Sequence, residues 1–392
     1  MATTVYDVTT WPGSISPYTD IGRVINEIIA DIKINQTTQT TKPGAVIYIP
    51  PGHYDLRTRV VVDISFLQIK GAGHGFMSEA VRDDNNTAQW YETLPGGSHI
   101  QVKNTDGHSE AFLIQRSGIP SNVGRLDAIV FQDFCLDGVN SSKPYLPGNG
   151  KVGISVQSET DALRIEGMGF VYLSQAIVMT GADAFNITNN FITECGTCIQ
   201  IDGFFIVGKI TNNYLISPWA GFSIFAANGE GMVVSGNSIL WGAKIQFKNV
   251  HRTCISANKF VSNFPGMIVH ETACDENLIS GNQFTRIYGD GVQTTYDDLY
   301  GMVQVNGRGN SVISNHFSFN VPRQNIIPAG ADPTVVLVKG GDNNYLATNH
   351  IISNVLAKVV LDGAATNTKV IYTASNAEFQ PLGTSYAFVP TP

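Results

Sequence analysis

A short phrase that recurs down the second half of this chain constrains its fold more than any other feature. The phrase is an apolar pair, a small polar residue, Asn, one variable residue and a large apolar residue, as in Ile279–Phe284. Its asparagines are 23, 25, 21, 24, 33 and 34 residues apart, at Asn189, Asn212, Asn237, Asn258, Asn282, Asn315 and Asn349. A period of about 20 to 50 residues is typical of a solenoid.

The short runs inside each repeat have the composition of strands. Ala184–Thr188 and Met232–Ser235 are rich in Val, Ile, Phe and Thr, which favour strands. No repeat contains the long run at 3.6-residue spacing that a helical repeat needs, and Leu does not hold the apolar positions. We therefore predict an all-β chain that folds as a parallel β-helix, in which each repeat is one coil and the coils stack about 4.8 Å apart.

The recurring Asn has a structural task in such a fold. A corner between strands needs a residue that tolerates a positive φ, and Asn does so better than other non-glycine residues. Stacked Asn side chains can also hydrogen-bond along the stack. We interpret the repeated Asn as architecture. The longer intervals of 33 and 34 residues indicate inserted loops, which often carry binding residues.

The two ends of a coil stack expose apolar surface and need caps. Asp20 is a suitable N-cap, and it precedes apolar residues at helical spacing: Ile21, Val24, Ile25, Ile28, Ile29 and Ile32. This helix, followed by a strand that ends in Pro50-Pro51-Gly52, resembles the entrance to pectate-lyase-like β-helices. We expect an N-terminal segment with the capping helix at 1–44, a β-helix at 45–373 and a C-terminal tail at 374–392.

Composition argues against several kinds of partner. Only 14% of the 392 residues are charged, the net charge is −8, and no Lys/Arg cluster appears, so neither nucleic acid nor an anionic membrane surface is expected to bind. No apolar run is long enough to span a membrane. The N-terminus lacks the charged and apolar regions of a signal peptide. We expect either a secreted protein whose sequence starts at the mature end or, alternatively, a cytoplasmic one.

The cysteines are interpreted as buried fillers of the coils. Cys195 and Cys198 form a C-x-x-C pair, but a zinc site needs a second pair, and a redox motif needs a strand-to-helix context. No metal and no organic cofactor is expected.

Two carboxylates stand in apolar or Gly-rich surroundings. Asp183 and Glu194 are 11 residues apart. A glutamate between Thr193 and Cys195 is costly to bury unless it is solvated or paired, and an apolar setting favours the protonated form that a general acid needs. Two carboxylates are the minimum for glycosyl transfer. The competing interpretation is a pair of surface carboxylates on a turn.

Motifs of the pectin-degrading β-helices do not fit. Gly73-His74-Gly75 is similar to a polygalacturonase pattern, but the paired Asp297-Asp298 follows far downstream, in the wrong order. A pectate lyase needs acidic calcium ligands and a catalytic arginine, and the arginines here are few and scattered. Both functions are therefore set aside.

Longer phrases resemble the inulin fructotransferase family. They run in order along nearly the whole chain: Tyr6–Trp11, Pro50–Leu56, Gly73–Phe76, Phe131–Val139, Gly167–Leu173, Gly181–Ala184, Glu194–Gly196, Phe264–Met267, Asp297–Gly301 and Pro328–Ala331. The resemblance implies a right-handed single-stranded β-helix, assembled as a homotrimer with active sites between subunits. It also implies cleavage of inulin from one end, with cyclisation of the terminal difructosyl unit to a difructose dianhydride, by intramolecular glycosyl transfer of the lyase type in a glycosidase-like site.

By motif, the catalytic Asp and Glu of the family fall on Asp183 and Glu194. The resemblance favours the type III dianhydride over type I. The coils from Phe204 to Phe225 and the insertion from Tyr288 to Asp298 depart from the family pattern, so cyclisation, hydrolysis and the type of product stay open.

Residues on the inserted loops are candidates for contacts with the fructan. They are Trp90, Phe264, Asp298, Tyr300 and Asn325, for each of which a packing or trimer-contact role is the alternative. The nearest alternative function is a difructose dianhydride III hydrolase that gives inulobiose. A more distant one is a non-catalytic fructan-binding β-helix trimer.

Overall fold

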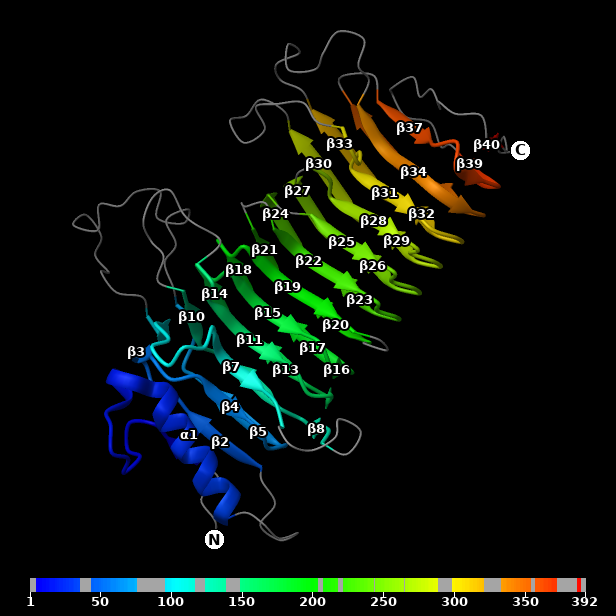
Figure 1. Cartoon of the computed structure of the whole chain (residues 1–392). Helices are drawn as coiled ribbons and strands as arrows, with labels where there is room; N and C mark the ends of the chain where they lie inside the picture. The colour runs from blue at the N-terminus through cyan, green and yellow to red at the C-terminus, as the bar shows by residue number, and fades with distance from the viewer. Residues whose placement is uncertain are drawn as a thin grey trace, which may run out of the picture. The chain divides into compact units, whose positions relative to one another are not determined.

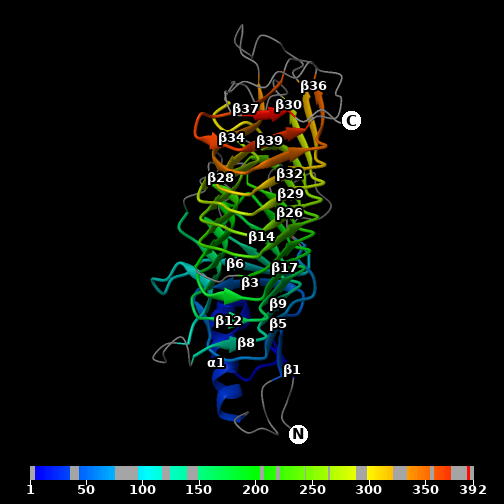
Figure 2. The same cartoon turned by 90° about the vertical axis from the view of Figure 1, so that its right-hand side faces the viewer.

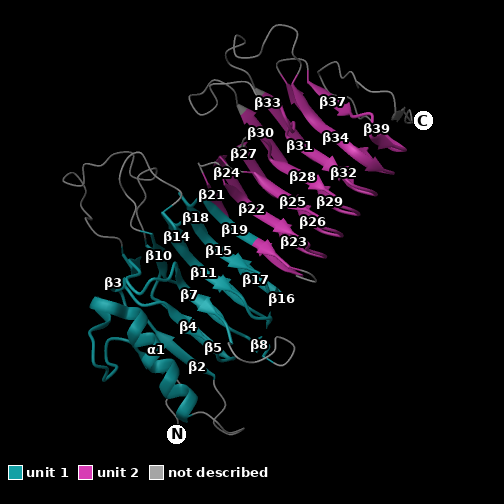
Figure 3. Cartoon of the chain, viewed as in Figure 1, with its two compact units in different colours: residues 1–200 teal, residues 201–392 magenta. Residues whose placement is uncertain are grey.

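Parallel strands dominate the computed structural model of this chain, which confirms the predicted all-β parallel β-helix. The structure describes residues 5–35, 44–75, 96–116, 124–138, 149–203, 207–217, 221–242, 244–263, 265–287, 298–320, 333–353, 357–371 and 386–388. The chain divides into two compact units, unit 1 at residues 1–200 and unit 2 at residues 201–392 (Figure 3).

Each coil of unit 1 runs through sheets A, B and C, and three coils add a short strand of sheet D before the chain returns to sheet A (Figure 1). Sheet A contains β1 (Val5–Asp7), β2 (Ala45–Tyr48), β5 (Leu67–Lys70), β9 (Val130–Gln132), β13 (Arg164–Glu166) and β17 (Phe185–Thr188). Sheet B contains β3 (Gly52–Leu56), β6 (Ser98–Val102), β10 (Cys135–Asp137), β14 (Gly169–Val171) and β18 (Phe191–Thr193). Sheet C contains β4 (Val60–Val62), β7 (Glu110–Ile114), β11 (Val152–Val156), β15 (Gln175–Met179) and β19 (Thr197–Asp202), and sheet D contains β8 (Leu126–Asp127), β12 (Thr160–Asp161) and β16 (Ala182–Asp183).

Unit 2 has the same order of sheets around each coil, and Figure 2 shows successive strands such as β26, β29 and β32 stacked on one another. Sheet A here contains β20 (Gly208–Thr211), β23 (Val233–Ser235), β26 (Cys254–Ser256), β29 (Leu278–Ser280), β32 (Ser311–Ile313), β35 (Tyr345–Ala347), β39 (Thr368–Ile371) and β40 (Tyr386–Phe388). Sheet B contains β21 (Tyr214–Ile216), β24 (Ser238–Gly242), β27 (Lys259–Asn263), β30 (Gln283–Ile287), β33 (His316–Asn320) and β36 (His350–Ser353). Sheet C contains β22 (Phe222–Ala227), β25 (Ile245–Lys248), β28 (Ile268–Thr272), β31 (Val303–Asn306), β34 (Thr334–Asp342) and β37 (Lys358–Leu361), and β38 (Ala365–Thr366) pairs with β34.

The corner between sheets A and B carries the predicted ladder of asparagines. In unit 2 each Asn donates from Nδ2 to the Oδ1 of the Asn in the next coil, at 2.9 to 3.0 Å. The rungs are Asn213, Asn237, Asn258, Asn282, Asn315 and Asn349. Most Nδ2 groups also bind a main-chain carbonyl, as Asn258 binds that of Val234 at 2.9 Å. The side chains therefore fasten each coil to its neighbours.

The predicted positive φ is confirmed at Asn189 and Asn212 and was wrong for the later asparagines of the phrase. The residue with positive φ is the one before the ladder residue, for example Ala257 with φ of 54° and Ser314 with φ of 54°. In the first two phrases the ladder residue is consequently Asn190 or Asn213, and Asn189 and Asn212 adopt the positive φ of 57°. Small residues suffice at the bend, whereas the rung requires an amide that both donates and accepts.

A second ladder, which the sequence analysis missed, lies at the corner between sheets C and A of unit 2. Asn277 donates to Asn310 at 3.2 Å, and Asn310 donates to Asn344 at 3.1 Å. All three side chains are buried. Inside the same unit, Phe260, Phe284 and Phe317 stack with ring centroids 4.8 and 4.7 Å apart. Both the polar corners and the apolar interior thus repeat from coil to coil.

The predicted capping helix is α1 (Pro17–Asn35), and its apolar face packs on β3 and β4. Asp20 leaves the helical conformation and accepts from the main-chain N–H of Arg23, as an N-cap does. Its carboxylate also accepts from the N–H groups of Arg57 and Thr58. The same aspartate therefore starts the helix and attaches it to the first coil.

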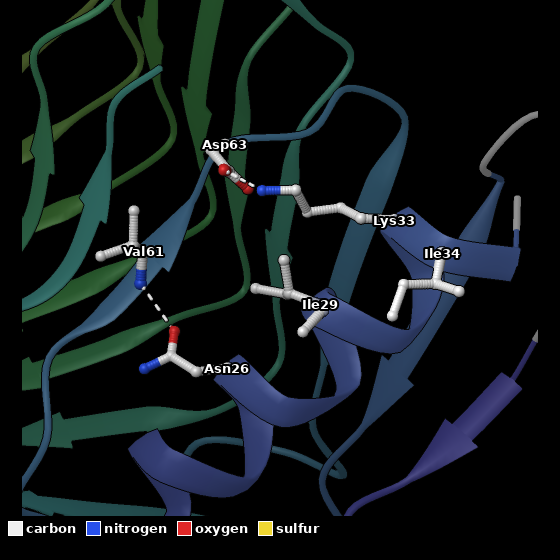
Figure 4. A pocket seen from close by; sticks show the side chains of 7 residues that line it. Asn26, Ile29, Lys33, Ile34, Val61 and Asp63 are labelled. Carbon is white, nitrogen blue, oxygen red and sulfur yellow. Dashed lines mark hydrogen bonds and ion pairs between the residues drawn. The ribbon is translucent and has the colours of Figure 1, made fainter. Parts of the chain in front are cut away.

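A shallow pocket of about 360 Å³ lies beside this helix (Figure 4). Asn26 accepts from the N–H of Val61 at 2.9 Å, and an ion pair joins Lys33 to Asp63. None of the lining residues belongs to sheet D or to the corner that carries Glu194. Among the described residues, no helix is long and apolar enough to cross a lipid bilayer.

The C-terminal strand β40 lies within the expected tail and pairs in parallel with β39. The division at residues 44 and 373 stays a prediction.

Candidate functional site

Asp183 is the last residue of β16 and the third member of a stack of aspartates. Sheet D pairs Asp127 with Asp161 and Asp161 with Asp183 in direct register. Each aspartate is followed by an alanine with positive φ, which turns the chain towards sheet A: Ala128 (50°), Ala162 (52°) and Ala184 (50°). An Asp-Ala dipeptide thus forms the same corner in three coils of unit 1. This repeat is visible in the sequence but is not part of the Asn phrase.

The members of this stack differ in their partners. Both carboxylate oxygens of Asp161 accept from Arg125, at 2.8 and 2.7 Å, and Glu159 binds the same guanidinium. The carboxylate of Asp183 is partly exposed and accepts from the adjacent N–H of Ala184 at 2.8 Å. Within the described ranges it forms no ion pair. Asp183 therefore ends the stack with a carboxylate that is open to a reacting group.

Glu194 occupies the corner between β18 and β19, and only 4% of its surface is exposed. Its φ of 51° matches that of Tyr172, 56°, at the same corner one coil earlier. The left-handed backbone is therefore a property of the corner and not of the glutamate. Cys195 is fully buried next to it, and burial raises the pKa of the Cys195 thiol well above its usual range. Glu194 therefore lies among buried side chains.

The structure does not bring these two carboxylates together within one chain. Asp183 follows the end of β15, whereas Glu194 precedes the start of β19, and both strands belong to sheet C. Figure 1 shows β16 and β18 at opposite ends of the sheet C strands. Five residues of strand at about 3.3 Å each separate the two corners by roughly 16 Å, whereas glycosidase carboxyl groups lie about 5 to 9.5 Å apart.

A cluster of charged groups that the sequence analysis missed lies on sheet B of unit 1. The Nδ1 atoms of His53 and His99 are 3.2 Å apart, and Nε2 of His99 lies 3.1 Å from Oδ2 of Asp137. Lys151 donates from Nζ to the carbonyl oxygen of Gly138 at 2.6 Å. His53 and Asp137 both fall inside phrases that carry the family resemblance, and this coincidence could have identified them.

Of the expected sugar contacts, Asp298 and Tyr300 are described and lie in unit 2. The carboxylate of Asp298 accepts from the main-chain N–H of Thr334 at 2.9 and 3.0 Å and from its hydroxyl at 2.5 Å. This carboxylate therefore anchors the turn that carries Tyr300. Trp90, Phe264 and Asn325 lie outside the described residues.

No group of three or more His, Cys, Asp or Glu side chains in the described ranges is placed to hold a metal ion. The C-x-x-C cysteines Cys195 and Cys198 are buried and form no disulfide, and Cys135, Cys254 and Cys274 form none either.

Comparison with known proteins gives consistent matches. A family model described as the β-helix repeat of inulin fructotransferase matches residues 280–392. An inulin fructotransferase described as DFA-I-forming, from Arthrobacter globiformis, is 63% identical over 393 residues and covers 100% of both chains.

Solved structures of a DFA-IIIase from Arthrobacter chlorophenolicus A6 are also similar. The form without its lid is 38% identical, with a TM-score of 0.88 and full coverage of both chains. The same form in complex with GF2 has a TM-score of 0.89 at 38% identity, also with full coverage. The enzyme in complex with DFA-III is 36% identical, with a TM-score of 0.84 and 94% coverage of both chains.

Proposed function

Because this chain belongs to the inulin fructotransferase family, we propose that it releases the terminal difructosyl unit of inulin as a cyclic difructose dianhydride. The observation that carries this proposal is the 63% identity to a fructotransferase over the full length of both chains. Structures of more distant relatives bound to GF2 and DFA-III support a fructose-containing ligand.

We propose type I as the product, although the resemblance of the phrases alone favours type III. The relative that is described as DFA-I-forming is 63% identical, whereas the chains described as DFA-IIIase are at most 38% identical among those compared above. The likeness to DFA-IIIase keeps hydrolysis of the type III dianhydride as the second candidate.

The proposed site pairs Asp183 of one subunit with Glu194 of a neighbouring subunit. Both residues lie in the same coil, so a rotation axis parallel to the stack of coils places them at the same height in adjacent chains. The corner after the sheet C strands of one subunit, which carries Asp183, then faces the corner before the sheet C strands of the next subunit, which carries Glu194. Such head-to-tail contacts close into a ring. A homotrimer of this kind supplies a short carboxylate separation that one chain lacks.

In the proposed reaction, Glu194 protonates the glycosidic oxygen that leaves C2 of the penultimate fructose. The bond between C2 and this oxygen breaks, and the shortened chain departs as an alcohol. A hydroxyl of the terminal fructose then forms the new bond to C2 and gives its proton to Asp183. Solvent exchange afterwards returns Asp183 to the carboxylate and Glu194 to the acid.

Water exclusion decides between cyclisation and hydrolysis. The attacking hydroxyl belongs to the same substrate molecule, so its effective molarity can exceed that of any solvent nucleophile once the unit is held in place. The 4% exposure of Glu194 supports a site that water enters poorly.

Chromatography of inulin digests, with the released disaccharide identified by NMR, tests the reaction. We expect the type I dianhydride. Release of inulobiose from the type III dianhydride would support the hydrolase, and binding of fructan without any small product would support the non-catalytic trimer.

Mixed assemblies test the shared site. Asp183→Asn and Glu194→Gln should each lower turnover by several orders of magnitude while the fold and the oligomer persist. Co-refolding the two variants at equal ratio should restore activity at about a quarter of the interfaces, since random pairing gives that fraction both native carboxylates. A mixture as inactive as its parents would show that both carboxylates must come from one chain.

We also propose that the protein is secreted, because a polymer such as inulin cannot cross a membrane unaided. Activity found in the cell lysate and absent from the culture medium of the native host would contradict this.

A further inference from the structure

Unit 2 holds a largely covered lysine side chain at the corner between sheets B and C. Lys244 directly precedes β25, and only 9% of its surface is exposed. Its burial lowers the pKa of the ammonium group. Within the described part of the chain, Nζ donates no hydrogen bond and forms no ion pair. The side chain is therefore largely covered, while Nζ is not among the buried polar atoms that lack a partner, and its three N–H donors stay open to a ligand.

Two aromatic rings account for part of its setting. Nζ lies 5.0 Å from the ring centroid of Phe222 and 5.7 Å from that of Tyr300. Both distances are within the range of a cation–π interaction. Such an interaction stabilises the charge but supplies no acceptor for the three N–H groups of the ammonium. The rings therefore stabilise the lysine as a cation, and its N–H groups remain available to an incoming acceptor.

The turn that carries Tyr300 is fixed before any ligand arrives. Asp298 binds Thr334 through three hydrogen bonds, and Arg286 donates to the carbonyl oxygen of Gly301 at 3.2 Å. Gly266 lies so close that a Cβ there would be 3.2 Å from the Cβ of Tyr300. A larger residue at position 266 would crowd both Val269 and Tyr300. The position of the ring is thus held from two sides.

The charges around Lys244 favour a neutral acceptor over an anion as its ligand. Glu271 already acts on Lys244 electrostatically and favours its charged form. Glu271 is exposed and accepts a hydrogen bond from Gln246 at 3.1 Å. The net charge of the chain is −8, which disfavours free anions. Hydroxyl oxygens satisfy an ammonium without bringing a second charge into the site.

We propose that Phe222, Lys244 and Tyr300 form a binding site for a neutral fructofuranosyl unit of the substrate chain. The apolar face of the furanose ring packs on Tyr300, and two adjacent hydroxyl oxygens accept from Nζ of Lys244. This inference rests on the proposed function, because the ligand is a unit of the fructan that the enzyme cleaves. It adds Lys244 and Phe222, which neither the repeat nor the family phrases indicate, as residues that determine substrate affinity.

Lys244→Met tests the site, because it keeps the length of the side chain and removes all three donors. A charged hydrogen bond to a ligand contributes enough that its loss weakens binding about tenfold or more. In the active enzyme, the KM for a purified linear inulin oligosaccharide should rise by this factor while kcat stays unchanged. Calorimetry in the Asp183→Asn, Glu194→Gln double variant should show the same rise in Kd. The matched control is Lys248→Met at the exposed end of the same strand, which should change neither value.

Each outcome separates this inference from the function it rests on. An active enzyme whose KM and Kd ignore Lys244→Met refutes the sugar site and leaves the proposed reaction intact. Dissociation of the oligomer in Lys244→Met, measured by light scattering with an unchanged Kd, would show that Lys244 contacts a second copy of the chain and would also refute the site. A protein that yields no dianhydride but binds the oligosaccharide through Lys244 would refute the reaction alone.

Discussion

The two corners that flank sheet B in unit 2 are built in opposite ways. At the corner between sheets A and B, six successive coils each place an asparagine in the ladder, and Nδ2 of one lies 2.9 to 3.0 Å from Oδ1 of the next. At the corner between sheets B and C, no ladder of hydrogen-bonded side chains runs through the described residues, and Lys244 and Tyr300 each occur in a single coil. The first corner satisfies its polar groups internally, whereas the second presents the N–H donors of Lys244 to a ligand. The corner between sheets A and B thus stabilises the coil, and the corner between sheets B and C is the one that we propose binds the substrate.

The ladder should give the largest effect on stability. Asn258 is 2% exposed, and its side chain takes part in four hydrogen bonds, two with Asn237, one with Val234 and one with Asn282. Asn258→Ala removes these bonds and leaves buried partners unsatisfied, so we expect a loss of roughly 3 to 5 kcal/mol in the free energy of unfolding. Denaturant unfolding measures the loss.

The matched control is Lys259→Ala, at the exposed neighbouring position, which should cost less than about 0.5 kcal/mol. If Asn258→Ala changed the KM for inulin without changing stability, the corner between sheets A and B would have a role in substrate binding and not in stability, which would contradict the comparison.

A buried histidine sharpens the comparison, because it is a polar group of the interior that no ladder satisfies. His270 stacks on Phe247, with ring centroids 6.0 Å apart, and burial lowers its pKa from 6.5 to about 4. Between these two pH values His270 is protonated in the unfolded chain and neutral in the folded chain. The free energy of unfolding should therefore fall by roughly 3 kcal/mol as the pH drops from 6.5 to 4, and this contribution is fully present above pH 6.5.

His270→Phe should remove this pH dependence, since it keeps an aromatic ring on Phe247 and has no group to protonate. The exposed His108→Asn serves as the control. Parallel stability curves for the wild type and His270→Phe between pH 4 and 6.5 would contradict the assignment.

The anchor of the Tyr300 turn should give a smaller effect, on function. Asp298→Ala removes the hydrogen bonds from Thr334 and loosens the turn. We expect the KM for inulin oligosaccharides to rise severalfold, about 1 kcal/mol of binding free energy, while kcat is retained. Steady-state kinetics test this, with Glu276→Ala on the surface as the control; an unchanged KM would remove Tyr300 from the sugar site.

The smallest effect is expected at the capping helix. Lys33 and Asp63 form an ion pair whose side chains are 48% and 26% exposed, so solvent and salt screen it. Lys33→Met should lower the free energy of unfolding by less than about 1 kcal/mol, and the difference should shrink at high salt. A loss as large as that of Asn258→Ala would show that the cap limits stability more than the ladder does.

The sequence predicts the scaffold well because each coil repeats the same physical requirement. The Asn phrase and the helix that starts at Asp20 both describe local chemistry. The exact rung was misassigned at Asn189 and Asn212, because two adjacent asparagines leave the register ambiguous until the neighbouring coils fix it. The second ladder at Asn277 escaped notice because its corner lacks a constant flanking phrase.

The candidate site was harder to predict, because a coil has several corners and sequence distance does not distinguish them. A spacing of 11 positions between Asp183 and Glu194 suggests proximity. A sheet A strand and a sheet B strand lie between them, however, and the two residues lie at opposite ends of the sheet C strands. Lys244 lies in an ordinary stretch of sequence. Only the fold shows that Phe222 and Tyr300, from two other coils, lie next to it.

The rungs of the Asn ladder keep their spacing regardless of how much chain lies between them. Asn237 and Asn258 are 21 residues apart and Asn315 and Asn349 are 34 apart, yet both pairs are joined at 2.9 to 3.0 Å. An inserted segment therefore leaves the phase of every later coil unchanged. Evolution can lengthen, shorten or exchange the loops of this protein one coil at a time, so specificity can drift among related enzymes while the backbone beneath them is inherited intact.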